Sequence, residues 1–241
     1  MQKCVAGMRV TLIAHTPDPE RVAASSARQC YSKNSATKAV ADLDEKEIRR
    51  LLRMVIGNGH LSVLEHASFT FAIEGISRAC SHQLVRHRIA SYSQQSQRYV
   101  KMDQLEWVVP DSIKSKQSAA DAFAKALDAC RACYSGMLAM GIPTEDARYI
   151  LPQASPTKIV VTMNARSLLN FFELRCCLRA QWEIRAAAET MLTLVRAVAP
   201  TIFEGAGPAC VSRKVCPDKI YDCPKWVELF KSGAKQGNID R

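Results

Sequence analysis

The feature that most constrains the fold is a pair of short segments in which apolar and polar residues alternate. Residues 67–74 have the alternation typical of a half-buried β-strand, with three apolar side chains on one face: Phe69, Phe71 and Ile73. Residues 158–163 form a second clear strand, and residues 8–14 form an earlier one that ends before Pro17. Since strands and helices occur together with no internal repeat and no linker dividing the core, the sequence predicts one α+β domain.

Helices are predicted where apolar residues recur every three or four positions. The predicted helices span residues 44–56, 76–87, 116–140, 144–150, 166–175 and 180–199. In the longest of them we expect a buried stripe formed by Ala119, Ala122, Phe123, Ala126, Leu127, Cys130, Tyr134, Met137 and Leu138. Residues 91–98 have no apolar period and predict a loop, whereas residues 105–109 predict a short strand.

Length and composition fit one globular domain. The chain has 241 residues, 48% of them hydrophobic, and no stretch reaches the roughly 18 uninterrupted apolar residues of a membrane span. We expect a single domain over residues 1–204, with a mainly antiparallel sheet flanked by helices and a long helical hairpin region, and a C-terminal tail over residues 205–241. The apolar run at the N-terminus is too short for a signal peptide, so we expect a cytoplasmic protein.

The formal net charge of +10 points to an anionic partner. Two segments hold most of the excess: Gly75–Met102 has five cations and no acid, and Ala147–Trp182 has five cations and one acid. Most of these cations are arginines, whose planar guanidinium binds phosphate through two hydrogen bonds. Nucleic acid, a phosphorylated metabolite and an acidic surface are each compatible with this charge. The alternative is that the cations are scattered over solvated helix faces and bind no particular partner.

The ten cysteines do not predict a disulfide framework, because the chain is long enough for a core and has no export signal. Cys130 and Cys133 have C-x-x-C spacing but fall inside the longest predicted helix, where we interpret both as small apolar residues. Cys210, Cys216 and Cys223 lie in the tail at spacings of six and seven residues. With a fourth ligand they could hold zinc, but they lack paired C-x-x-C motifs, so we predict no metal site.

The most informative segment runs from Arg86 to Tyr99, with the sequence RHRIASYSQQSQRY. Its hydroxyls, amides and backbone N–H groups suit the edge of a heterocycle, and its flanking arginines suit phosphates. It has neither the G-x-x-x-x-G-K-[ST] of a P-loop nor the G-x-G-x-x-G of a dinucleotide-binding turn. From these residues alone the segment predicts a site for a nucleotide or a phosphorylated cofactor, with a basic surface loop as the alternative.

The segment resembles the signature of the flavin-dependent thymidylate synthases, R-H-R-x-x-S-x-N-x-x-S-x-R-Y. The matching residues are Arg86, His87, Arg88, Ser91, Ser96, Arg98 and Tyr99. Further elements resemble the same family: GHLSVLEH at residues 59–66, ARYILP at 147–152, NARSLLNF at 164–171, LR at 174–175 and AQWEI at 180–184.

Three departures from the family pattern stand out. Ser93 replaces the Asn of the signature, and Gln94 replaces an acid that many members have. Both replacements can still form hydrogen bonds, so we expect altered contacts rather than a lost site. Arg179 stands where a His is common before the AQWEI element.

The resemblance implies an enzyme that converts dUMP to dTMP, with methylenetetrahydrofolate as carbon donor, FAD as cofactor and NADPH as reductant. It also implies a homotetramer in which several subunits build each active site. The residues implied to bind FAD are His60, Ser62, Glu65, Arg86, His87, Arg88, Gln94, Asn164, Arg166 and Asn170. Those implied to bind dUMP are Gln83, Leu84, Val85, Arg86, Gln94, Gln95, Ser96, Gln97, Arg98, Arg148 and Arg175.

Arg175 is implied to be the catalytic residue. Uracil C5 is a poor nucleophile until negative charge enters the ring, and a guanidinium placed where that charge develops stabilises it. The resemblance implies no enzyme nucleophile, because reduced flavin supplies the hydride and its N5 relays the carbon. Ser96 has no His beside it in the motif to act as a base, so we interpret it as a dUMP ligand.

A basic nucleic-acid-binding module is the alternative function, and its affinity would fall steeply with salt. The basic segment offers only Tyr92 and Tyr99 for stacking on bases. The sequence therefore predicts no obligatory nucleic-acid partner and no membrane partner.

Overall fold

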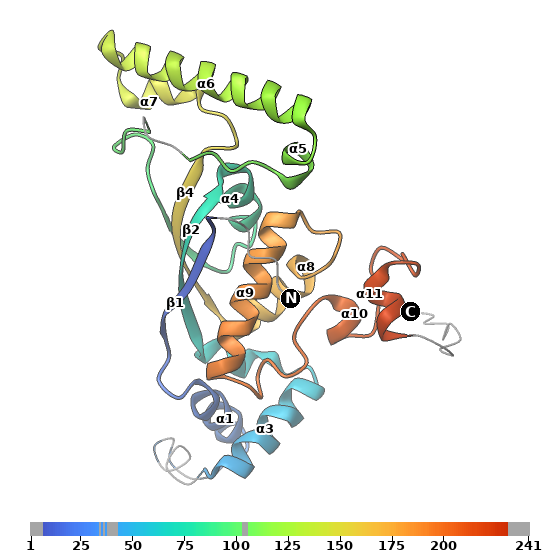
Figure 1. Ribbon diagram of the computed structural model, residues 1–241. Coiled ribbons are helices and arrows are strands. Elements are labelled where there is room, and N and C mark those ends of the chain that lie inside the picture. The colour runs from blue at the N-terminus through green and yellow to red at the C-terminus, as the bar shows by residue number, and fades with distance from the viewer. Residues whose placement is uncertain (1–6, 34, 36, 38–42, 103–105, 231–241) are drawn as a thin grey trace. The chain divides into compact units, whose positions relative to one another are not determined.

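The computed structural model describes residues 7–33, 35, 37, 43–102 and 106–230 (Figure 1). The chain divides into two compact units. The first comprises Met1–Ile13 and Thr70–Thr162, and the second comprises Ala14–Phe69 and Met163–Arg241. Every crossing from one unit to the other falls within a β-strand.

A four-stranded antiparallel sheet has the strand order β1-β2-β4-β3. Its strands are β1 (Arg9–His15), β2 (Ser68–Ser77), β3 (Ser91–Gln94) and β4 (Pro156–Asn164). The alternation in β2 buries one face completely, the face that bears Phe69, Phe71 and Ile73. The hydroxyls of Thr70 in β2 and Thr162 in β4 share a hydrogen bond of 2.9 Å. The predicted α+β class and the antiparallel sheet are confirmed.

Gly75 lies inside β2 with a φ of 71°. A Cβ atom at this position would lie 2.0 Å from the carbonyl oxygen of Gly7, so any other residue would collide with that backbone. The predicted strand ends at residue 74, whereas β2 continues through the glycine to Ser77.

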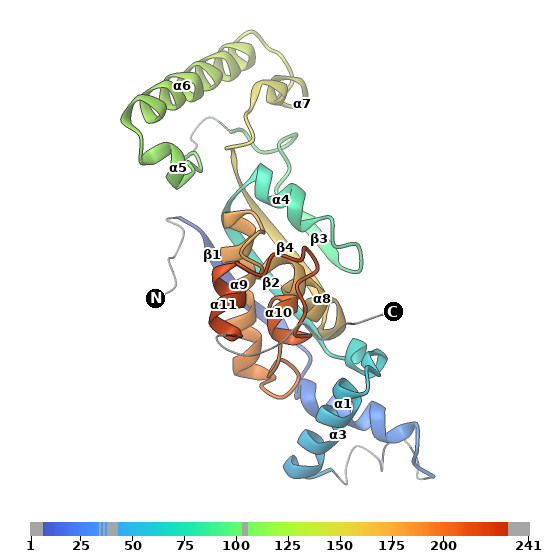
Figure 2. The ribbon, with the colours of Figure 1, turned by 90° about the vertical axis from the view of Figure 1, so that its right-hand side faces the viewer.

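The second unit holds two pairs of packed helices and a short C-terminal helical region. Its helices are α1 (Pro19–Gln29), α3 (Glu45–Gly57), the 3₁₀ turn η1 (Leu61–His66), α8 (Ala165–Arg175), α9 (Trp182–Val198), α10 (Ala209–Ser212) and α11 (Pro224–Leu229). In Figures 1 and 2, α1 lies beside α3 and α8 lies beside α9. Aromatic rings form part of the core, because the Phe203 ring centroid is 5.5 Å from that of Phe69 and 5.9 Å from that of Phe172.

The first unit contains the longest helix. Its helices are α4 (Arg78–Leu84), α5 (Asp111–Lys114), α6 (Gln117–Ala139), α7 (Thr144–Ala147) and the 3₁₀ turn η2 (Arg148–Ile150). Figure 2 shows α6 running beside α7, the region for which the sequence predicts a long helical hairpin. Tyr134 of α6 packs with Met102 and Ala147, and its hydroxyl accepts a hydrogen bond of 3.1 Å from the Met102 N–H.

The apolar stripe of α6 is covered only in part. Of its predicted members, Leu127 and Tyr134 are buried, but Ala122 and Ala126 are exposed. The prediction of a wholly buried stripe is therefore wrong, because the small core around Tyr134 covers only part of the helix.

The structure differs from the prediction in further places, and the sequence does not predict the short elements η1, α5, α10 and α11. Residues 91–98 begin with strand β3 rather than forming a loop throughout, and residues 106–109 are not a strand, with residue 105 outside the described residues. The sequence does not predict α1, yet Pro19 occupies its first position, where a proline costs no helical hydrogen bond. The other predicted helices and strands are confirmed, with their ends shifted by a few residues. Among the described residues, none of the helices is long and apolar enough to span a membrane.

Candidate functional site

The turn that bears Arg86, His87 and Arg88 is held in place by Tyr92. The Tyr92 hydroxyl lies 2.9 Å from the carbonyl oxygen of Leu84 and 2.8 Å from that of His87. Burial raises the pKa of Tyr92 to about 12, so the phenol stays protonated and can donate to these carbonyls at neutral pH. Arg86 and Arg88 are exposed and therefore accessible to an anionic ligand.

Strand β3 carries the middle of the signature along the edge of the sheet. It pairs with β4 in a register that sets Ser91 opposite Thr162 and Gln94 opposite Ile159. The Gln94 Nε2 donates to Ser81 Oγ at 2.9 Å and to Thr157 Oγ1 at 3.2 Å, so its amide is engaged by the protein. Its assignment to dUMP and FAD stays a prediction.

Three arginines gather around Glu145 and Gln95 in the first unit. Arg98 Nε donates to the Glu145 carboxylate at 2.8 Å, and Arg148 Nε donates to the Glu145 backbone carbonyl at 3.0 Å. Arg78 Nη2 donates to the Gln95 carbonyl at 3.4 Å. The pKa of Arg78 is lowered by its burial and, secondly, by the positive charge of Arg148. This cluster has three positive charges against one negative charge and suits a phosphate.

Sequence reasoning missed Arg78 as a site residue. Its Nε is buried and, within the described part of the chain, lacks a hydrogen-bond partner, and the same holds for Gln97 Nε2. A buried donor without an acceptor is costly, so both nitrogens mark places where a ligand oxygen would be favoured. One sequence feature could have pointed to Arg78 as a site residue, because it belongs to the acid-free segment Gly75–Met102. It lies outside the Arg86–Tyr99 signature, however.

The second unit holds another group of predicted site residues where η1 meets the start of α8. Arg166 Nη1 donates to Glu65 Oε1 at 2.6 Å. The backbone joins the same two elements, because the Ala165 N–H donates to the Ala67 carbonyl at 2.8 Å. His60 and Ser62, at the beginning of η1, are exposed.

The first turn of α8 is fixed by Asn164. Its Oδ1 caps the helix by accepting a hydrogen bond of 2.8 Å from the Ser167 N–H. The side-chain nitrogen of Asn164 is not needed for this cap. Arg166 and Asn170 are four residues apart, so they share a face of α8, and both are exposed.

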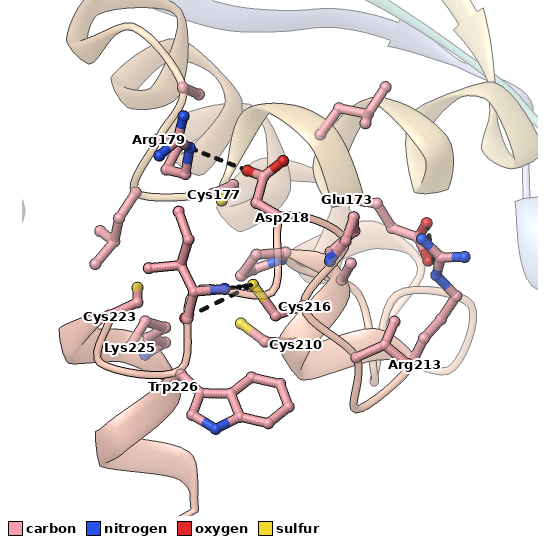
Figure 3. Close-up of a pocket in the computed structure, with 18 of the residues that line it drawn as sticks. Glu173, Cys177, Arg179, Cys210, Arg213, Cys216, Asp218, Cys223, Lys225 and Trp226 are labelled. Carbon is pink, nitrogen blue, oxygen red and sulfur yellow. Dashed lines mark hydrogen bonds and ion pairs between the residues drawn. The ribbon is translucent and has the colours of Figure 1, made fainter. Parts of the chain in front are cut away.

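Arg175 is the last residue of α8 and lines a cavity of about 350 Å³ (Figure 3). The remaining walls come from the loop between α8 and α9 and from residues 208–226, which we call the C-terminal segment. Four cysteines face this cavity: Cys177, Cys210, Cys216 and Cys223. Burial raises the pKa of the Cys210 thiol, with the neighbouring thiols adding to the effect. Among the described residues, no three Cys, His, Asp or Glu side chains are placed to hold a metal ion.

The predicted site residues thus divide into one group per unit, and within the second unit Arg175 lies at the opposite end of α8 from Asn164 and Arg166. The first-unit group contains Gln83, Leu84, Val85, Arg86, His87, Arg88, Gln94, Gln95, Ser96, Gln97, Arg98 and Arg148, and Arg78 joins it. The second-unit group contains His60, Ser62, Glu65, Asn164, Arg166, Asn170 and Arg175. The Leu84 side chain is buried, and its carbonyl accepts from Tyr92, so a contact from Leu84 to a ligand would have to use another part of the residue.

The donor sets of the two groups differ in chemistry. The first-unit group is rich in guanidinium and amide donors, which bind phosphate oxygens and the polar edge of a base. The second-unit group adds an imidazole, a carboxylate, amides and further guanidinium groups, a mixture that can bind both the phosphates and the ring of a nucleotide cofactor.

Comparison with known proteins supports one family. The family model described as thymidylate synthase complementing protein matches residues 11–201. The flavin-dependent thymidylate synthase of Geobacter sulfurreducens is 52% identical over 224 residues, covering 92% of this chain and 96% of the relative. The flavin-dependent thymidylate synthase of Clostridium tetani is 45% identical over 241 residues, covering 93% of this chain and 96% of the relative. That of Pyrococcus abyssi is 44% identical over 240 residues, with 93% and 98% covered.

Proposed function

Because the chain belongs to the flavin-dependent thymidylate synthase family, we propose that its two groups of site residues hold dUMP and FAD while dUMP is converted to dTMP. Membership of the family makes this protein an enzyme of thymidylate synthesis with FAD as its cofactor and with dUMP and a folate as its substrates. The finer assignments of residues to ligands are proposals, and the contacts of each group support them.

The phosphate of dUMP is assigned to Arg78, Arg98 and Arg148. The observation that supports this assignment best is the buried Arg78 Nε, which lacks an acceptor among the described residues. A phosphate oxygen would supply that acceptor and would also offset the repulsion between Arg78 and Arg148. Gln97 Nε2 is a second buried donor that a dUMP oxygen would satisfy. The other residues of the proposed dUMP site are Gln83, Leu84, Val85, Arg86, Gln94, Gln95 and Ser96.

FAD is assigned to polar residues of both groups, most of which are exposed. The donor chemistry fits, since exposed guanidinium groups at Arg86, Arg88 and Arg166 suit the FAD phosphates, and the Asn170 amide lies on the same helix face as Arg166. The other residues of the proposed FAD site are His60, Ser62, Glu65, His87, Gln94 and Asn164. These residues would hold FAD, which, once reduced by NADPH, would supply hydride and one-carbon transfer chemistry to the reaction.

Arg175 is proposed to act on the uracil ring. A guanidinium beside the ring favours loss of the N3 proton and stabilises the negative charge that makes C5 nucleophilic. Arg175 lies on a cavity wall that also includes apolar side chains such as Leu174 and Trp226, so surrounding water is partly excluded. A weakly solvated guanidinium stabilises a developing anion more strongly than one in bulk water.

A homotetramer with shared active sites is part of the proposal, with NADPH as the reductant. Several large apolar side chains of the first unit are strongly exposed in the single chain: Ile89, Tyr99, Met140 and Tyr149. Together with the uncovered part of the α6 stripe, they support burial against further copies of the chain. In such an assembly the first-unit group and the second-unit group that complete one active site can come from different subunits.

Absorbance spectroscopy tests the assignment of FAD and dUMP to this protein. We expect purified protein, supplied with FAD and freed of excess cofactor, to keep a flavin spectrum that changes on addition of dUMP. Deoxyuridine, which lacks the phosphate, should cause the same change only at much higher concentration. Protein that stays colourless after incubation with FAD would contradict the proposal.

A further inference from the structure

The C-terminal segment is attached to the helix end that bears Arg175. Glu173 lies in the last turn of α8, and its Oε1 accepts a hydrogen bond of 2.9 Å from Ser212 Oγ. Its Oε2 pairs with Arg213 Nε at 3.1 Å. These contacts tie the segment to α8 two residues before Arg175.

A second attachment lies four residues beyond Arg175. Arg179, in the loop that follows α8, pairs through its Nε with Asp218 Oδ2 at 3.0 Å (Figure 3). Arg175, Arg179 and Asp218 all line the 350 Å³ cavity. Two other cations on its wall have acidic partners of their own, because Arg213 pairs with Glu173 and Lys225 pairs with Glu228.

The Arg179–Asp218 pair gives a structural reason for a departure from the family signature. Arg179 stands where a His is common, and its longer side chain ends in a planar set of donors that reaches a carboxylate of the C-terminal segment. The alignment with the Geobacter protein covers 92% of this chain, so it must extend beyond residue 205. The segment that supplies Asp218 therefore begins within a region shared with that relative.

We propose that Asp218 is a positioning residue for the thymidylate reaction, which acts through Arg179 to fix the loop after α8 and thereby the Arg175 guanidinium. This inference rests on the proposed contact between Arg175 and uracil. Other hydrogen bonds of the loop after Arg175 in the described structure run from the Cys176 N–H to the Phe172 carbonyl at 3.0 Å, from the Ala180 N–H to the Cys177 carbonyl at 2.9 Å and from Arg185 Nη1 to the Leu178 carbonyl at 2.8 Å, so the Arg179–Asp218 pair is the contact that ties it to the C-terminal segment. Catalytic geometry is sensitive, since a misplacement of about 1 Å can cost about a hundredfold in rate.

The exposure of the pair separates a positioning role from a stabilising one. The Arg179 and Asp218 side chains are 61% and 54% exposed, and ion pairs in such surroundings contribute little to the free energy of unfolding. Loss of the pair should therefore leave the melting temperature nearly unchanged while it disturbs Arg175. If the pair mainly stabilised the fold, its loss would lower the melting temperature and the activity together.

A charge-swap cycle on the FAD-loaded enzyme tests the proposal. The variants are Asp218→Asn, Arg179→Gln and the double exchange Arg179→Asp with Asp218→Arg, and each is measured for kcat, for KM for dUMP and for melting temperature. We expect each single variant to lose about tenfold in kcat/KM. We expect the exchanged pair to recover most of that loss, and Asp218→Glu to stay near wild type. Arg50→Gln is the control, because Arg50 forms a similarly exposed pair with Glu47 in α3.

The outcomes distinguish this inference from the proposed function. A wild-type enzyme without dUMP turnover, or an Arg175→Ala variant with normal turnover, would count against the proposed function itself. If wild type turns over and Arg175→Ala does not, unchanged kinetics in Asp218→Asn would overturn the positioning role. An exchanged pair that shows only the combined losses of its single variants, or an Asp218→Asn loss matched by a large drop in melting temperature, would overturn it as well.

Discussion

Arg78 places a guanidinium beside Arg148 with part of its donor set buried and unused among the described residues. The buried donor without an acceptor and the repulsion between the two guanidinium groups are both unfavourable, and a bound anion would reduce both. The dUMP phosphate is therefore assigned there. The sequence signature begins at Arg86 and gives no reason to single out Arg78. Burial and the neighbouring charge distinguish this residue, and both depend on the folded chain.

Replacing Arg78 should weaken dUMP binding selectively. We expect Arg78→Met to raise the Kd for dUMP about tenfold or more, since a hydrogen bond to a charged group contributes about 1.5–3 kcal/mol. Binding of deoxyuridine should barely change, because that ligand has no phosphate. Titration of the flavin spectrum with each ligand provides the measurement. Arg9→Met serves as control, since Arg9 is an exposed arginine paired with Glu74 in the same unit, and an equal loss in both variants would refute the assignment.

Cys176 should be the slower of two test thiols to react with an alkylating agent. Burial raises its pKa to about 12, whereas Cys133 is exposed. Because the thiolate is the reactive form, Cys176 should stay unlabelled at pH 8 and react faster as the pH rises. The raised pKa also means that its contribution to stability is complete below pH 9.0 and declines as the pH approaches 12. Mass spectrometry after brief labelling with iodoacetamide tests this, and equal labelling of Cys176 and Cys133 at pH 8 would show it to be wrong.

At the scale of elements, hydrophobic alternation located β2 and β4 because both bury one face, and apolar periodicity located α8 and α9 for the same reason. Strand β3 has the sequence SYSQ and lies at the edge of the sheet. Backbone pairing with β4 holds this strand in the sheet. Such pairing does not require alternating apolar side chains, so the sequence of β3 has no hydrophobic pattern that would predict a strand. Helix α1 was not predicted, because a proline such as Pro19 usually interrupts a helix. Here Pro19 is the first residue of the helix, in the one turn where a proline is tolerated.

The junction between α4 and β3 should depend on the Tyr92 hydroxyl. We expect Tyr92→Phe to lower the free energy of unfolding by about 1–2 kcal/mol, because the carbonyls of Leu84 and His87 lose a partner. The turn with Arg86 and Arg88 would then be less fixed, so KM for dUMP should also rise. Thermal unfolding of the variant beside Tyr31→Phe provides the comparison, since Tyr31 is 77% exposed. Equal melting temperatures for the two variants would contradict this role.

For the whole molecule, the sequence predicted the residue types of the site more fully than their arrangement. Resemblance to the family named Arg98, Arg148, Arg166 and Arg175, but only the folded chain sorts them into two groups and shows which have acidic partners. The cluster of Arg78, Arg98 and Arg148 around one carboxylate accounts for part of the +10 charge, for which the sequence alone left several anionic partners open.

The exposed apolar side chains of the first unit favour association of several copies of the chain. We expect light scattering after gel filtration to give four times the 26.7 kDa mass of the chain, because the apolar faces of α6 and of the Tyr149 turn would be covered by other subunits. Elution at the mass of a single chain at micromolar concentration would argue against shared active sites.

The most direct test of the central claim is tritium release from [5-³H]dUMP by the purified enzyme with a methylenetetrahydrofolate donor, FAD and NADPH. We expect release together with dTMP formation in the wild type. Both should be lost when FAD is omitted from the stripped enzyme, and both should fall about a hundredfold or more in Arg175→Ala. Release that persists without flavin, or that is unaffected in Arg175→Ala, would contradict the proposed function.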